Sequence, residues 1–220
     1  MEDIVISLGG SLVNPGKIDE TFLHKFSEMI NSLLNEYRFI IIVGGGKLAR
    51  DYIEIGRKRG ENEYYLDMLG IIATRLNALL VKSFIKNAKY VSNPNEIRDE
   101  NVVMGGTEPG HTTDAVSLLV AEMLGIKSVI NATTVDGIYD KDPKLYNDAK
   151  LIEKISYNDL LSMFYINKSG AGPNQVLDFL SIKIAERSSI EIKVLNGKDI
   201  ENFKRAIRGE NFKGTRVYKK

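Results

Sequence analysis

The sequence has no cysteine and no tryptophan, and only two of its 220 residues are histidine. The absence of cysteine excludes a disulfide framework, a cysteine-based zinc site and a thiol nucleophile. It also fits a reducing compartment, so we expect a cytoplasmic protein. Lysine and arginine number 30 and acidic residues 29, which gives a formal net charge of +1. This balance provides no general attraction to nucleic acid or to anionic lipid.

Long apolar runs are also missing. The longest, residues 39–43, has five residues, whereas a helix needs about 20 to cross a bilayer. The acidic start Met1-Glu2-Asp3 lacks the basic and apolar regions of a signal peptide. A chain of this length can bury most of its apolar surface without disulfides. We therefore expect a single domain over residues 1–220 with no membrane partner.

Short apolar runs alternate with segments of helical period. The runs predict strands over 4–8, 39–43, 88–91, 102–104, 128–132, 190–195 and 215–218, the last at a sheet edge. The periodic segments predict helices over 22–34, 48–59, 66–86, 113–124, 157–165, 175–188 and 200–208. Polar stretches at 93–101 and 165–174 predict surface loops. The alternation is typical of an α/β fold with a mostly parallel sheet covered on both faces.

Eight of the 19 glycines lie in three short clusters, which are Gly9-Gly10, Gly44-Gly45-Gly46, and Gly105-Gly106 with Gly110. Each cluster follows a predicted strand and leads into a helix. In a parallel sheet such turns meet at the carboxyl edge, where ligands bind. Glycine lets the backbone approach a phosphate closely, and a helix N-terminus presents free N–H groups. The three turns together favour a phosphate-binding site over simple tight turns.

Two common nucleotide-binding motifs do not account for these turns. The chain has no Gly-x-x-x-x-Gly-Lys-Ser/Thr sequence, which excludes a P-loop. Gly44-x-Gly46-x-x-Ala49 matches a dinucleotide fingerprint, but no strand ending in an acid follows about 20 residues later. The acids near that position, Glu63 and Asp67, lie in polar or helical sequence.

Polar side chains next to the turns indicate the chemistry. Lys47 and Arg50 follow the triple glycine, where a point charge and a bidentate guanidinium suit phosphate. Asp67 could accept hydrogen bonds from sugar hydroxyls, although a helix cap is an equally good interpretation. Segment 105–114 is dense in hydroxyl, carboxylate and imidazole groups, and its two threonines could cap the following helix. Segment 133–143 has an Asp-Gly turn and an aromatic side chain that could hold a flat ring and its sugar.

Four ordered motifs resemble the amino acid kinase family. They are Leu8-Gly9-Gly10-Ser11, Gly44-Gly45-Gly46-x-x-x-Arg50, segment 105–114, and Val135-Asp136-Gly137-Ile138-Tyr139 with Asp142-Pro143. Over about residues 4–217 the set is similar to the uridylate kinases of that family, of the archaeal type. The resemblance implies a three-layer αβα sandwich with the phosphate acceptor held by about 1–125 and ATP by about 126–220. It also implies a homohexamer that transfers the γ-phosphoryl group of ATP to UMP with Mg²⁺, giving UDP and ADP in pyrimidine nucleotide biosynthesis.

The resemblance assigns roles to individual residues. It implies ATP contacts from Ser7, Gly9, Gly10, Ser11, Gly46, Arg50, Thr133, Thr134, Tyr139 and Asp142. It implies UMP contacts from Gly45, Arg50, Asp67, Thr107, Glu108, Pro109, Gly110, His111, Thr112 and Thr113. Gly10 would act in catalysis, and Asp114 matches the acid that orders the catalytic basic groups in related kinases. The Mg²⁺ ligands are left unassigned.

Two positions depart from the family pattern. Many members carry a lysine where this chain has Ser7, and that cation stabilises the transferring phosphoryl group. We expect Lys47 to replace it, with Lys17 a weaker candidate. Thr134 stands where an asparagine is common, which affects only ATP affinity.

Ser7 also keeps a non-catalytic nucleotide-binding protein open as an alternative. Other small-molecule kinases of the fold are a second alternative. Isopentenyl phosphate kinases usually have a histidine after the triple glycine, and acetylglutamate kinases a second lysine late in the chain. Residues 47–49 and 175–178 do not supply these groups.

Overall fold

The computed structural model describes residues 1–143, 145–166 and 176–220. The strands of this part form one sheet in the order β3-β4-β2-β1-β5-β7-β8-β6. Their bounds are β1 Glu2–Leu8, β2 Tyr37–Val43, β3 Lys89–Tyr90, β4 Val102–Met104, β5 Ser128–Thr133, β6 Lys154–Ser156, β7 Glu191–Asn196 and β8 Thr215–Tyr218. Neighbouring strands run parallel except β7 and β8. The predicted α/β class is therefore confirmed.

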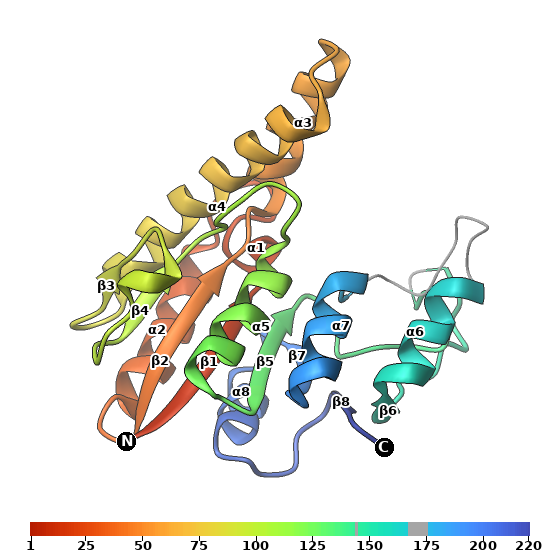
Figure 1. Ribbon diagram of the computed structural model, residues 1–220. Helices are drawn as coiled ribbons and strands as arrows, with labels where there is room; N and C mark the ends of the chain where they lie inside the picture. The colour runs from red at the N-terminus through yellow and green to blue at the C-terminus, as the bar shows by residue number, and fades with distance from the viewer. Residues whose placement is uncertain (144, 167–175) are drawn as a thin grey trace.

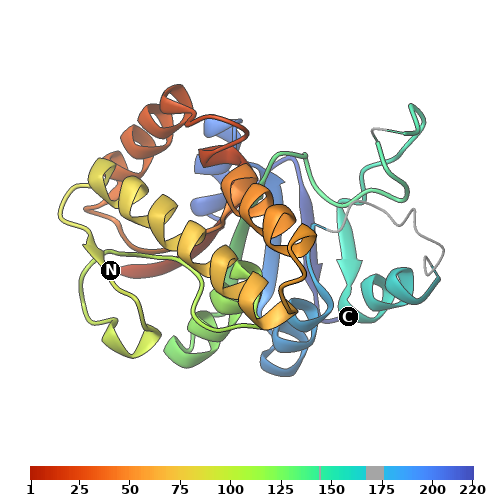
Figure 2. The same cartoon turned by 90° about the horizontal axis from the view of Figure 1, so that it is seen from above.

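Helices cover both faces of this sheet (Figures 1 and 2). The α-helices are α1 Gly10–Val13, α2 Glu20–Leu33, α3 Gly46–Lys58, α4 Glu63–Phe84, α5 Thr113–Leu124, α6 Tyr157–Ile166, α7 Phe179–Ser188 and α8 Ile200–Ile207. Helices α2, α4 and α8 share an apolar core with one face, and α5, α6 and α7 share one with the other. Helix α3 packs on α4, and the pair projects past the carboxyl ends of the strands (Figure 1).

The strand period decides which side chains face each layer. In β1, Ile6 and Leu8 are buried in the core under α2, α4 and α8, whereas Val5 is buried in the core under α5 and α7. Ser7 shares the face of Val5 and is paired in register with Asn131 of β5. Both polar residues therefore lie on the α5 side of the sheet.

The structure corrects several predicted boundaries. Helix α7 begins at Phe179 rather than 175, because the Asp178 side chain accepts a hydrogen bond from the Ser181 N–H and caps the helix. Strand β8 is not at the edge, since β6, which the sequence pattern did not reveal, pairs with it on the outside. The predicted strand 88–91 is reduced to two residues, and the predicted loop 93–101 contains a 3₁₀ turn at Pro94–Glu96. The predicted loop at 165–174 falls almost wholly outside the described residues.

The expectation that no segment is long enough to cross a membrane needs correction for α4. Within the 22 residues of this helix, an 18-residue window has a mean hydropathy of 1.2, which meets the length and composition of a span. The search for uninterrupted apolar runs did not find this helix, because polar residues divide its sequence. In the structure α4 packs on α3 and on the sheet, and its Arg75 and Asn77 side chains bond to backbone loops. These contacts are those of a core helix in a layered fold.

Candidate functional site

Three glycine turns meet at the carboxyl edge of the sheet, after β1, β2 and β4. The first two are interlocked, because a side chain at Gly10 would overlap the backbone of Gly44 and Gly46. A Cβ atom at Gly44 would lie 2.6 Å from the Gly10 nitrogen. Gly46 has a φ of +62°, a conformation that side chains disfavour. Close backbone packing therefore explains the glycines at these positions.

The interlocked turns leave amide donors available. The N–H groups of Gly10, Gly45 and Gly46 donate no hydrogen bond to any residue that the structure describes. Gly46 is also the first residue of the 13-residue helix α3, whose dipole favours an anion. Amides arranged in this way can form a backbone cradle for phosphate oxygens, and the phosphate-binding role of the glycine turns stays a prediction.

Two basic side chains of α3 flank this cradle. The Arg50 Nη1 donates to the Ser11 hydroxyl over 3.3 Å, so the guanidinium reaches the first glycine turn from the second. Lys47 lies exposed on the first turn of α3 and forms an ion pair with Asp51. It makes no ion pair with Asp114. Lys17 is exposed in the segment that precedes α2.

Ser7 and Asp114 are in direct contact. The Ser7 hydroxyl donates to Asp114 Oδ1 over 2.6 Å, which joins β1 to the first turn of α5. The pKa of the Asp114 carboxyl is raised to about 6: burial is the largest cause and the nearby Asp178 adds to it, while the Ser7 hydrogen bond and the Asn131 amide act in the opposite direction. In the described part of the chain no basic side chain pairs with Asp114.

Asn131 is the second polar group beside Asp114. It is buried, and its Nδ2 has no hydrogen-bond partner of acceptable geometry among the described residues. Its amide nevertheless lies close enough to lower the pKa of Asp114. The carboxylate that the resemblance associates with basic groups is here surrounded by a hydroxyl and an amide.

A cleft of about 360 Å³ lies beside the third glycine turn. Its lining residues are Ala49, Ile53, Asp67, Gly70, Ile71, Thr74, Gly106, Gly110, His111, Thr112 and Thr113. Asp67 Oδ2 accepts a hydrogen bond from the Gly110 N–H over 2.7 Å, and Gly110 has a φ of +83°. Asp67 is thus a cleft residue, and the helix cap is supplied by Asn62. The size is within the range of small-molecule sites.

Three other residues of this loop that were expected to contact UMP, Thr107, Glu108 and Pro109, are not among the residues that line the cleft. Thr107 and Pro109 are half-buried and Glu108 is exposed. Thr112 caps α5 by accepting from the Ala115 N–H over 3.1 Å, and its hydroxyl donates to Asp178. Asp178, which sequence reasoning missed, therefore links the loop before α5 to α7. An isolated aspartate before a helix gives no sequence signal beyond capping.

Helix α4 supplies three more side chains that sequence reasoning missed. Thr74 Oγ1 accepts from the Gly106 N–H over 2.7 Å. Arg75 donates to the carbonyl oxygens of Gly106 and Thr107, each over 3.1 Å. Asn77 Nδ2 donates to the Gly44 oxygen over 2.9 Å and to the Gly45 oxygen over 3.1 Å. The polar residues inside an apolar helix were the available signal.

The residues expected to hold ATP are on the neighbouring strand β5 and its following loop. The Gly9 N–H donates to the Ala132 oxygen over 2.8 Å, which places Thr133 next to the first glycine turn. Thr134 is exposed, and burial raises the pKa of the half-buried Tyr139 hydroxyl. The Asp142 carbonyl accepts from the N–H groups of residues 145 and 146. The carboxyl edge of the sheet thus brings Thr133 of the predicted ATP set next to the glycine turns.

The sequence pattern of the amino acid kinase family matches residues 3–196. The chain belongs to the amino acid kinase family. It is 40% identical to the uridylate kinase of Methanobrevibacter smithii, with 99% of each chain covered, and 40% identical to that of Pyrococcus abyssi, covering 97% of this chain and 98% of the other. The crystal structure of uridylate kinase from Archaeoglobus fulgidus superposes with a TM-score of 0.84 at 39% identity, covering 99% and 100% of the two chains.

This family membership confirms the three-layer αβα kinase fold that the motifs implied. The matched region contains all three glycine turns, the cleft and the loop after β5. The chain is therefore a kinase, and the cradle of free amides is the part of it that suits phosphoryl transfer.

Proposed function

We propose that the chain is a UMP kinase that uses ATP. In the reaction an oxygen of the UMP phosphate attacks the γ-phosphorus of ATP, and the bond from that phosphorus to the β–γ bridging oxygen breaks. The products are UDP and ADP. The observation that carries the proposal is the cradle of free Gly10, Gly45 and Gly46 amides next to the cleft that contains Asp67. The uridylate kinase relatives, about 40% identical over the whole chain, support it.

The two substrates would approach the cradle from opposite sides. UMP would occupy the cleft in the part formed by about residues 1–125, with its ribose on Asp67 and its phosphate near Gly45 and Arg50. The loop over 107–113 would surround the uracil and the phosphate. ATP would lie on the part formed by about 126–220, along Thr133, Thr134, Tyr139 and Asp142, with its γ-phosphate above Gly9, Gly10, Ser11 and Gly46.

The protein's contribution to the rate would be positioning and charge neutralisation, because phosphoryl transfer needs little covalent chemistry from the enzyme. Lys47 would leave its exposed ion pair with Asp51 and approach the transferring group. An exposed pair of this kind contributes about 1 kcal/mol or less, so its loss costs little. Asp114 would orient donors around the site through Ser7.

Mg²⁺ would enter with ATP. In kinases this ion is held by phosphate oxygens and one or two carboxylates rather than by a cage of protein ligands. The described residues contain no group of three or more histidine, aspartate or glutamate side chains that could hold a metal. The ion would supply neutralisation of phosphate charge.

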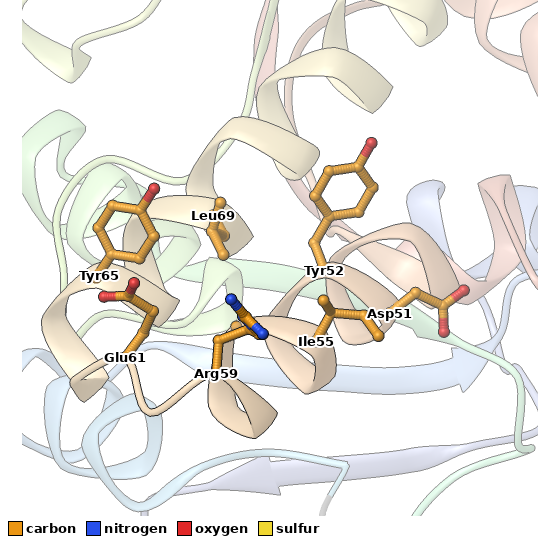
Figure 3. A pocket seen from close by; sticks show the side chains of 8 residues that line it. Asp51, Tyr52, Ile55, Arg59, Glu61, Tyr65 and Leu69 are labelled. Carbon is orange, nitrogen blue, oxygen red and sulfur yellow. The ribbon is translucent and has the colours of Figure 1, made fainter.

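The assembly would be a homohexamer whose contacts include the outer surface of α3 and α4. Large apolar side chains are exposed there, namely Tyr52, Ile55, Tyr64, Tyr65, Ile72, Leu76 and Leu79. Several line a second cleft of about 520 Å³ between the two helices (Figure 3). An exposed apolar surface of this kind is typical of a protein–protein contact.

Such an enzyme would work in the cytoplasm, in pyrimidine nucleotide biosynthesis.

An acceptor panel tests the activity. Release of ADP from ATP and Mg²⁺ is measured with UMP, CMP, dUMP, acetylglutamate, carbamate and isopentenyl phosphate. We expect turnover with UMP and none with the last three. Turnover with one of those three and none with UMP would replace the proposed function with that of another kinase of the family. Binding of ATP without ADP formation for any acceptor would indicate a non-catalytic protein.

A further inference from the structure

Asn77 is a buried polar side chain inside an otherwise largely apolar helix. Only 2% of its surface is exposed, and it lies on the α4 face that covers the second glycine turn. Its Nδ2 donates one hydrogen bond to the Gly44 oxygen and one to the Gly45 oxygen, at 2.9 and 3.1 Å. A carboxamide nitrogen has two hydrogens, so both are used on this turn.

These two hydrogen bonds also set the direction of the N–H groups of Gly45 and Gly46. All described peptide bonds are trans, and in a planar trans peptide the C=O and the following N–H point in opposite directions. Holding the Gly44 oxygen toward α4 therefore directs the Gly45 N–H away from α4. Holding the Gly45 oxygen in the same way directs the Gly46 N–H away from it.

These two N–H groups are among the donors that no described residue uses. Glycine residues would otherwise rotate with little resistance, because they lack a Cβ atom. The Ala49 N–H also donates to the Gly45 oxygen, over 3.3 Å, and Gly44 and Gly46 pack against Gly10. Asn77 adds a side-chain restraint on both peptide planes to these backbone contacts. Among the described residues, Asn77 is the side chain that bonds to both carbonyls.

We propose that Asn77 is a positioning residue that directs the Gly45 and Gly46 amides at bound phosphate. The Asn77 side chain does not contact the substrate. It fixes two peptide planes, and the N–H groups on the opposite side of these planes, those of Gly45 and Gly46, contact the phosphate. The proposal rests on the proposed function for the identity of the phosphates, but the direction of the amides follows from the structure alone.

The test combines Asn77→Ala and Asn77→Asp with the control Asn202→Ala. Asn202 is also buried, at 1% exposure, and also donates to a backbone oxygen, that of Lys213 over 2.8 Å, but it lies outside the glycine turns. The readouts are the melting temperature, kcat and KM for UMP, and the amide NMR shifts of Gly45 and Gly46 during titration with inorganic phosphate.

We expect both Asn77 variants to lower kcat at least tenfold, with KM for UMP changed less than threefold. The phosphate-dependent shifts of Gly45 and Gly46 should weaken in the same variants. Asn202→Ala should lower the melting temperature by a similar amount but keep those shifts. If Asn77→Ala does not fold, Asn77→Asp, which keeps the size of the side chain but has no donor, carries the test.

Unchanged kcat and unchanged shifts in the Asn77 variants would overturn the proposal, as would an equal loss of the shifts in Asn202→Ala. A wild-type protein that forms no UDP, yet shows phosphate-dependent shifts that Asn77→Ala abolishes, would overturn the proposed function and leave the role of Asn77 supported.

Discussion

The two halves of the sheet hold their loops in different ways. On the side proposed to hold UMP, the buried Thr74 and Asn77 and the half-buried Arg75 of α4 bond directly to the backbone of the glycine turns after β4 and β2. The turns after β1 and β2 also interlock with each other. On the side proposed to hold ATP, the loop after β5 is held by Asp136, whose carboxylate pairs with the exposed Lys213 and accepts from Asn196 over 3.1 Å. The buried Thr215 also holds this loop, because its Oγ1 accepts from the Ile138 N–H over 2.8 Å. In the first half two loops pack backbone against backbone, whereas in the second the loop is held by side chains of β7 and of residues 213–215.

The pKa values of one carboxylate in each half, Asp114 and Asp136, are shifted in opposite directions. Burial raises the pKa of Asp114 to about 6, whereas Lys213 lowers the pKa of Asp136 below its usual value. The first half therefore carries an unfavourable buried charge next to the interlocked turns, and the second half carries a charge that Lys213 compensates. Rigid placement is what phosphoryl transfer requires of the site where the two phosphates meet.

The largest effect is expected from Gly10→Ala, which attacks the interlocked frame. Its Cβ atom would overlap the backbone of Gly44 and Gly46, and neither can move without disturbing the cradle. We expect kcat to fall by about a thousandfold or more, as in the loss of a transition-state donor. The control is Gly16→Ala, where an added Cβ meets nothing within 4 Å. Equal activities of the two variants would show that the frame is not rigid.

Asp114→Asn tests the buried charge. Because the folded pKa is above the usual value of 3.8, ionisation of Asp114 opposes folding. Its stabilising contribution is complete below about pH 4 and is lost as the pH rises through about 6. Asparagine does not ionise, so the stability of the variant does not fall as the pH rises through about 6. At pH 7.5 its unfolding free energy should therefore exceed that of the wild type by at most about 3 kcal/mol.

Urea unfolding at pH 4 and pH 7.5 measures this difference. The corresponding Asp136→Asn variant is the control, since its pKa shift has the opposite sign and the substitution should destabilise at neutral pH. A stability difference between Asp114→Asn and the wild type that does not grow with pH would contradict the account.

Lys47→Ala tests whether the acceptor side supplies the missing cation. We expect kcat to fall at least tenfold, with little change in UMP binding, because the charge would act on the transferring group. The control is Lys58→Ala, which breaks another exposed i,i+4 pair of α3, with Glu54. A near-normal kcat for Lys47→Ala would remove this residue from the mechanism.

The smallest effect is expected on the donor side, from Lys213→Ala. The ion pair with Asp136 is exposed on its lysine side, and such pairs are worth about 1 kcal/mol or less. We expect KM for ATP to rise by about fivefold at most and KM for UMP to stay constant. Steady-state kinetics with each substrate varied in turn measures both. A larger effect on UMP than on ATP would reverse the proposed sides.

The sequence predicted the parts of the fold that follow from local period. Buried strands such as β1 and β2 and the capped helix α5 were found because apolar spacing and threonine at 112 mark them. The three-residue strand β6 was missed, since so short a segment has no readable period. Outer strand order depends on long-range pairing, which local patterns do not contain.

The candidate site divides in the same way. Glycine turns were found because glycine is concentrated where the backbone has no room. Asp67 was found beside the cleft, but Asn77 and Arg75 were missed. Their partners lie more than 30 residues away, and a polar residue in a helix does not reveal which carbonyl it contacts. Lys47 stays a prediction, since its side chain pairs with Asp51 in this structure.

The central claim is that the interlocked glycine turns on the acceptor side are where ATP and UMP exchange a phosphoryl group. ³¹P NMR of a mixture of protein, ATP, UMP and Mg²⁺ tests it most directly, with Gly10→Ala and Gly16→Ala run beside the wild type. The account predicts UDP and ADP in equal amounts from the wild type and Gly16→Ala, and almost none from Gly10→Ala. UDP formation by Gly10→Ala at the wild-type rate, or ADP without UDP from the wild type, would contradict it.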